Sequence, residues 1–177
     1  MPPAPQQPSL EPLPPRAQPP DASGPAPTAV LLWHAQPDGG GHVDWLVQAR
    51  LPAGPDDRAA VGWRVAIRPD QLRPDQLLPG QALDAEPLPP HRALYLNLRH
   101  ATTLSGDRGT VTPLAWGWMD AGGSNGGSNT APAAGTPAPA PSPLHVFTIR
   151  WHRGPTLTYR VHAAASATRI ECIARTA

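Results

Sequence analysis

Three residues of the types that ligate metal ions lie close together in the first third of the chain. The apolar run TAVLLWH ends on His34, a Gly-rich turn over residues 36–41 follows, and His42 and Asp44 begin the next run. Residues i and i+2 of a strand face the same side, so His42 and Asp44 can converge on one ion, with His34 beside them across the turn. Two imidazoles and a carboxylate suit Mn²⁺, Zn²⁺ or Fe²⁺ and leave open positions for water or substrate. The alternative is a hairpin whose polar side chains are solvated or hydrogen-bonded, and spacing alone does not decide between them.

The segments that must position these residues read as short β-strands. Each run is rich in Val, Ile, Thr, Trp or Tyr, turn residues separate the runs, and residues 145–152 alternate with a period of two. Residues 69–90 contain many prolines and read as irregular, with one helical turn near Pro74–Leu78. Short strands without helical periodicity favour an all-β barrel or sandwich, for which we predict about eight antiparallel strands. The predicted strands are residues 28–34, 42–50, 61–68, 93–98, 109–119, 145–152, 156–163 and 168–175.

The composition divides the chain into one domain and two low-complexity segments. The 177 residues include 27 prolines and 16 glycines, which concentrate in residues 1–27 and 121–143. We predict a disordered Pro-rich tail over 1–27 and one domain over 28–176, interrupted by a flexible loop over 121–143. The segment after that loop is too short to fold alone, so it belongs to the same domain.

Charge and cysteine content exclude several classes of protein. The formal net charge is +1, which argues against a polybasic nucleic-acid binder, and every basic residue other than histidine is arginine. Cys172 is the only cysteine, so neither an intramolecular disulfide nor a cysteine metal cluster forms. The N-terminus lacks the basic and apolar regions of a secretory signal, and no apolar run is long enough for a membrane helix. We therefore expect a soluble, cytoplasmic protein that is monomeric and has no membrane partner.

Four stretches in order resemble a known family. They are HAQPDGGGHVDWLVQ, VGWRVAIRP, PPHRALYLNL and LSGDRGTVTPLAWG, over about residues 29–120. Their order is similar to that in the 3′-phosphoesterase domain of bacterial DNA ligase D and its stand-alone relatives. The resemblance implies a β-barrel with its site on one open face. It also implies metal-dependent trimming of DNA 3′ ends, by removal of a 3′-phosphate or a terminal ribonucleotide.

Matched by position, the resemblance implies roles for individual residues. His34, His42 and Asp44 match the metal ligands, for which Mn²⁺ is the first expectation and Zn²⁺ or another transition metal the alternative. The partners it implies are DNA or RNA–DNA 3′ ends and other end-joining repair proteins. The remaining matches are His91 for a phosphate-contacting histidine, Tyr95 for a tyrosine near it, Arg68 for a phosphate-contacting lysine and Trp63 for a core tryptophan.

The chain also departs from the family pattern. Leu46 stands where the family has an arginine that clamps the scissile phosphate, Gln48 replaces an acidic residue, and Leu32 replaces a glutamine. Losing a phosphate clamp weakens a site whose catalysis is mostly positioning and charge stabilisation. Three alternatives follow: another arginine supplies the clamp, the substrate differs, or the domain is a non-catalytic nucleic-acid- or partner-binding barrel with a vestigial metal site. The candidate clamps are Arg64, Arg92, Arg99 and Arg108, the last of which lies in a second Gly-rich turn, SGDRG, over residues 105–109.

Overall fold

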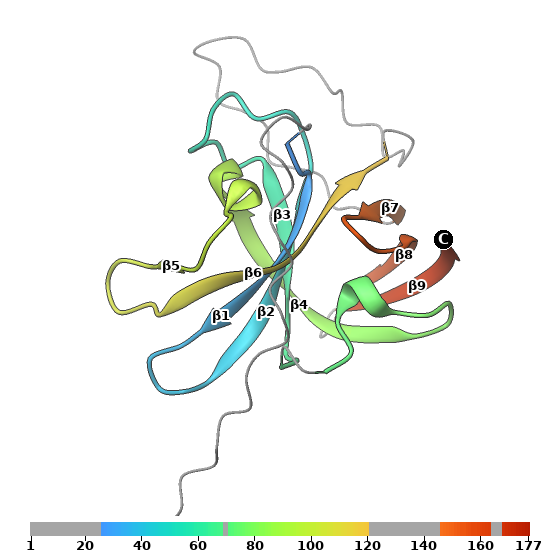
Figure 1. The fold of residues 1–177 in the computed structure, drawn as a ribbon, viewed down its shortest axis with the longest axis horizontal. Helices are drawn as coiled ribbons and strands as arrows, with labels where there is room; N and C mark the ends of the chain where they lie inside the picture. The colour runs from blue at the N-terminus through green and yellow to red at the C-terminus, as the bar shows by residue number, and fades with distance from the viewer. Residues whose placement is uncertain (1–25, 69–70, 121–145, 164–167) are drawn as a thin grey trace, which may run out of the picture.

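Eight antiparallel strands close into a barrel in the computed structural model (Figure 1). The structure describes residues 26–68, 71–120, 146–163 and 168–177. Within these ranges the strands pair in the order β1-β2-β3-β4-β9-β8-β7-β6, β6 pairs again with β1, and the short β5 adds to the free part of β6. The predicted all-β barrel of about eight strands is confirmed.

Two short 3₁₀ helices, η1 and η2, lie in connections between the strands. In chain order the elements are β1 (Ala29–Ala35), β2 (Gly41–Gln48), β3 (Ala60–Val65), η1 (Pro74–Gln76), β4 (Ala82–His91), η2 (Ala93–Asn97), β5 (Thr102–Thr103), β6 (Thr110–Met119), β7 (Val146–Trp151), β8 (Thr156–Ala163) and β9 (Thr168–Thr176).

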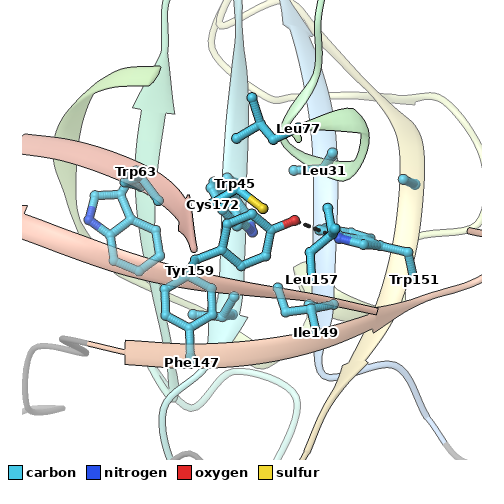
Figure 2. Close-up of a cluster of buried hydrophobic side chains, with 14 of the residues drawn as sticks. Leu31, Trp45, Trp63, Leu77, Phe147, Ile149, Trp151, Leu157, Tyr159 and Cys172 are labelled. Atoms are coloured by element: carbon cyan, nitrogen blue, oxygen red, sulfur yellow. Dashed lines mark hydrogen bonds between the residues drawn. The ribbon is translucent and has the colours of Figure 1, made fainter. Parts of the chain in front are cut away.

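The period-two alternation of the strands separates an inner from an outer face. All eight barrel strands contribute buried or partly buried apolar side chains to one cluster, which is the barrel interior. Its centre is aromatic: the rings of Trp45 and Tyr159 meet edge to face with centroids 4.7 Å apart, and those of Trp63 and Phe147 stack at 5.6 Å. Figure 2 shows these rings beside Trp151 and Cys172.

One polar side chain within this interior is fully hydrogen-bonded. The hydroxyl of Tyr159 accepts a hydrogen bond of 2.7 Å from the indole nitrogen of Trp151 (Figure 2) and donates one of 2.8 Å to the carbonyl of Pro74. Pro74 begins η1, so this bond fastens η1 to the barrel interior. The presence of η1 at Pro74–Gln76 confirms the helical turn predicted near residues 74–78.

A second apolar cluster lies on the outer face of β1, β2 and β6. It joins Leu32, Leu46 and Trp116 to Leu96 of η2. We predicted a strand over residues 93–98, and that prediction is wrong. Ala93 and Leu96 are the buried residues of the segment, which is the spacing of three that a 3₁₀ turn produces. The first backbone N–H groups of η2 donate to carbonyls of the loop that precedes β3, so they need no strand partner.

The expectation that residues 69–90 are irregular is also wrong, because β4 occupies the second half of that segment. Ala82–Ala85 pair with β9, whereas among the described residues the part of β4 that holds its three prolines pairs only with β3. Proline lacks the N–H that a central strand position uses, so it is tolerated where one side of the strand has no partner. The prolines therefore misled the sequence interpretation although a strand forms.

The predicted disordered tail over residues 1–27 and the predicted flexible loop over 121–143 lie, apart from residues 26 and 27, outside the described residues. The described part of the chain contains no helix long and apolar enough to cross a membrane.

Candidate metal centre

The β1–β2 hairpin brings the three proposed ligands together. His34 is the direct cross-strand partner of His42, and Leu32 is that of Asp44, so all three polar residues project from the outer face of neighbouring strands. The turn over residues 36–40 sets this register through two backbone hydrogen bonds and a bond from the Gly40 N–H to the Asp38 carboxylate. The placement predicted from the spacing is therefore observed.

The ligand atoms face one another at short range. Nδ1 of His34 lies 3.6 Å from Oδ2 of Asp44, and Nε2 of His42 lies 3.1 Å from Oδ1 of Asp44. One ligand atom from each residue falls within 4.8 Å of the other two. Atoms that share an ion at about 2.1 Å lie roughly 3–3.5 Å apart, so a small inward movement would bring these three atoms to the spacing that a shared ion requires.

Two of these atoms have no hydrogen-bond partner within the described part of the chain. Nε2 of His42 and Oδ1 of Asp44 are both buried, and their 3.1 Å approach lacks the alignment of a hydrogen bond. Buried polar atoms without a partner cost about 1–3 kcal/mol, whereas a shared cation would satisfy both at once. The unsatisfied pair is thus an observation that fits a metal ion.

A backbone carbonyl orients His34. Its Nε2 lies 2.5 Å from the carbonyl oxygen of Arg108. A carbonyl only accepts, so this nitrogen carries the proton and Nδ1 stays free as a ligand. Arg108 sits in the turn before β6, and the next residue, Gly109, has a φ of +88° and no room for a side chain against the Ala35 carbonyl. The turn that contains Arg108 and Gly109 therefore holds His34 in the tautomer that would leave Nδ1 free to bind a metal ion.

The electrostatics favour the neutral, ligating form of His42. Burial lowers the pKa of His42, Asp44 raises it in opposition, and the charge of Arg64 and the neighbouring His34 lower it further. The net direction is downward. A neutral imidazole is the form that binds a divalent cation.

A cavity of about 480 Å³ opens beside this cluster on the outer face of the barrel. His34 and Asp44 line it together with two of the predicted catalytic residues, His91 at the end of β4 and Tyr95 in η2. The rings of His91 and Tyr95 meet edge to face at 5.9 Å. Nδ1 of His91 lies 2.7 Å from the carbonyl of Pro89, so it carries the proton and leaves Nε2 for a ligand.

Only some of the arginines that the sequence predicts at the site line the cavity. Arg108, predicted as a catalytic residue, lines the cavity, as do Arg64 and Arg92 from the list of candidate clamps. Arg68 follows β3 on the surface and is not among the residues that line the cavity. Arg99, the fourth candidate, is also outside that lining and donates to the carbonyls of Leu96 and Leu98.

One cavity residue escaped the sequence interpretation altogether. Arg58 lines the cavity, and its Nη1 donates a hydrogen bond of 3.0 Å to the carbonyl of Pro90, next to His91. The sequence shows Arg58 only as a charged residue shortly before the strand predicted over residues 61–68, and charged residues are common at such surface positions. The pairing of β3 with β4 is what places it beside His91.

The geometry defines a class: an antiparallel β-barrel with a two-histidine, one-carboxylate cluster on its outer face, opening onto an arginine-lined cavity. Comparison of the chain with models of protein families, with curated proteins and with solved structures finds no match.

Proposed function

We propose that this domain is a divalent-metal-dependent phosphoesterase that acts on the 3′ ends of DNA in repair, removing a 3′-phosphate or a terminal ribonucleotide. One observation carries the proposal: the His34, His42 and Asp44 cluster opens onto a cavity that four arginines also line. Cationic side chains beside a metal cluster form a recurrent arrangement for phosphoryl chemistry. The ordered resemblance of residues 29–120 to the DNA ligase D phosphoesterase domain supports the same chemistry, and a cytoplasmic location remains part of the proposal.

The donor set fits a transition-metal ion better than Mg²⁺ or Ca²⁺. Two imidazole nitrogens and one carboxylate are ligands for Mn²⁺, Zn²⁺ or Fe²⁺, whereas all-oxygen sets suit Mg²⁺ and Ca²⁺. We propose Mn²⁺ first and Zn²⁺ or another transition metal as the alternative. When bound, the ion supplies Lewis-acid stabilisation of a phosphoryl oxygen.

The chain's own residues bind and orient the phosphate. The guanidinium groups of Arg58, Arg64, Arg92 and Arg108 give the cavity an excess of positive charge over its single carboxylate, which attracts an anionic substrate. His91, held through Nδ1 by the Pro89 carbonyl, directs Nε2 to a phosphate oxygen or leaving group, and as an imidazolium, with both ring nitrogens protonated, it donates a hydrogen bond or a proton there. Tyr95 packs against the His91 ring and restricts its rotation.

A second candidate function rests on Leu46. This side chain lines the cavity but is fully buried in the outer apolar cluster, where the family resemblance expects a cationic clamp. A barrel with a weakened grip on the scissile phosphate would bind nucleic-acid ends or a partner through its arginines without turnover. Binding without product distinguishes this candidate from the first.

The test is turnover by the full chain with Mn²⁺ and a DNA primer that ends in a 3′-phosphate. We expect phosphate release that a chelator abolishes, and a loss of about 100-fold or more in Asp44→Asn because the metal site loses its carboxylate. His162→Ala is the control, since this exposed histidine on β8 pairs with Glu171 on β9 and does not line the cavity. Absence of product at high enzyme, with correctly folded protein, refutes the catalytic proposal. Chelator-sensitive retention of the same primer on filters would then support the binding function.

A further inference from the structure

Arg64 of β3 lies directly beside the metal-type cluster. It is the cross-strand partner of Asp44, so both side chains project from the same outer face of adjacent strands. Neighbouring strands lie about 4.8 Å apart, whereas residues i and i+2 of one strand lie about 6.6 Å apart, so the backbone of Arg64 is nearer to that of Asp44 than the backbone of residue 46 is.

The hydrogen-bonding capacity of Arg64 is mostly unused. Nη1 reaches Oε2 of Glu86 at 3.4 Å, a long contact between side chains that are 41% and 67% exposed, and such pairs contribute little. The Nε atom is buried and has no hydrogen-bond partner among the described residues. Because the Nε edge is buried, this guanidinium can offer its two terminal Nη groups side by side to two oxygens of one anion.

The other cavity arginines are held by neighbours at shorter range. Arg58 donates to a backbone carbonyl at 3.0 Å, and Arg92 donates to Asp56 at 3.2 Å while its guanidinium lies 5.7 Å from the centre of the Tyr95 ring. Arg108 donates to the backbone oxygen of Ser105 at 2.8 Å and to its hydroxyl at 3.0 Å. Among the described residues, Arg64 is therefore the cavity arginine whose hydrogen-bonded contact is the longest, at 3.4 Å, so turning to a ligand costs it the least.

We propose that Arg64 grips the terminal phosphate of the substrate, holding two of its oxygens through its two Nη groups while the phosphate lies against the His34, His42 and Asp44 cluster. This inference rests on the proposed function and adds the residue that sets its preference for a phosphorylated end. Leu46 occupies the alternative position on β2 and is committed to apolar packing: a Cβ on its partner Gly62 would overlap the Leu46 side chain. The grip therefore comes from β3.

Glu86 competes with the phosphate for the same guanidinium. It is the cross-strand partner of Arg64 on β4, so the two side chains meet whenever no anion is bound. Removing the Glu86 charge frees the Arg64 guanidinium from this contact and removes the repulsion between the Glu86 carboxylate and the incoming phosphate. Substitutions at the two positions should therefore change phosphate affinity in opposite directions, which a purely structural role for Arg64 would not produce.

The test compares two DNA oligonucleotides, one with a 3′-phosphate and one with a 3′-hydroxyl, against the full chain loaded with Mn²⁺. Arg64→Gln should weaken binding of the phosphorylated oligonucleotide about 10- to 100-fold and leave the hydroxyl-ended one nearly unchanged, because a charge-assisted bidentate contact is lost. The affinity of Arg64→Lys for the phosphorylated oligonucleotide should lie between those of wild type and Arg64→Gln, since lysine keeps the charge but lacks the paired donors of a guanidinium. Glu86→Gln should tighten binding about two- to threefold. Arg160→Gln, an exposed arginine on β8, is the matched control.

Mn²⁺ binding measured alone by calorimetry, together with a thermal melt, identifies any variant that has lost the metal site or the fold. Equal affinity of wild type and Arg64→Gln for the 3′-phosphate overturns the inference, as does a wild type that does not distinguish the two oligonucleotides. The binding result and the turnover result test different proposals. Arg64-dependent binding without product refutes the proposed catalysis alone, whereas turnover with KM and kcat unchanged in Arg64→Gln refutes the grip alone.

Discussion

Gly109 should control the metal centre although it is not a ligand. Its φ of +88° lies in the left-handed region, and a Cβ built on it would overlap the carbonyl oxygen of Ala35 at the end of β1. Its neighbour Arg108 supplies the carbonyl that fixes the tautomer of His34. Gly109→Ala must therefore move the turn away from β1, and that movement withdraws the carbonyl from the histidine.

The expected magnitude follows from two costs. The left-handed backbone costs an alanine about 1–2 kcal/mol, and relief of the overlap with Ala35 adds about 1–3 kcal/mol. Gly106 in the same turn isolates the first cost, because its φ is +70° and a Cβ there would meet no atom within 4 Å. We expect Gly109→Ala to lower the free energy of unfolding by about 2–5 kcal/mol and Gly106→Ala by about 1–2 kcal/mol.

Metal affinity gives the decisive measurement for Gly109. Loss of an outer-shell hydrogen bond to a ligating histidine typically weakens metal binding about 10- to 100-fold. Urea denaturation measures the stability of the two glycine variants, and calorimetric titration with Mn²⁺ measures their affinity. Equal stability losses, or a Mn²⁺ affinity in Gly109→Ala no weaker than in Gly106→Ala, would refute the reasoning that the turn positions His34.

Two further substitutions test the fold itself. Asp57 receives both Nη groups of Arg50, at 2.5 and 2.6 Å, and this pair lowers its pKa from 3.8 to about 2. Because the folded-state pKa is depressed, the stabilisation is present above pH 4 and is lost as the pH falls toward 2, so wild type should lose about 2 kcal/mol more than Asp57→Asn between pH 5 and 2. Parallel acid-dependent losses in urea titrations would contradict this. Tyr159→Phe should cost about 1–3 kcal/mol by the same titrations, because the buried Trp151 N–H and Pro74 carbonyl lose their partner; a loss below about 0.5 kcal/mol would show that these groups find another.

Local patterns account for what could be predicted of the fold. The alternation in residues 146–151 places Phe147, Ile149 and Trp151 inside the barrel, as their spacing indicates. The same rule failed at residues 93–98, where Leu94, Leu96 and Leu98 alternate like a strand. There the loop before β3 satisfies the first N–H groups and the outer face of the barrel buries every third residue, so a 3₁₀ turn forms. Such long-range partners leave no trace in a short window of sequence.

The candidate site divides in the same way. His42 and Asp44 share a face because side chains of a strand alternate with a period of two. The Gly-rich turn over residues 36–41 indicated that the chain reverses there and brings His34 beside them. These relations are local, so the sequence determined them. Which arginine reaches the cluster depends on the register of β3 against β2, and that register put Arg64, not Arg68, beside Asp44. Likewise, the pairing of β3 with β4 brought Arg58 to His91. Only the tertiary structure decided this second set, because strand register and cavity walls arise from contacts between segments distant in the chain.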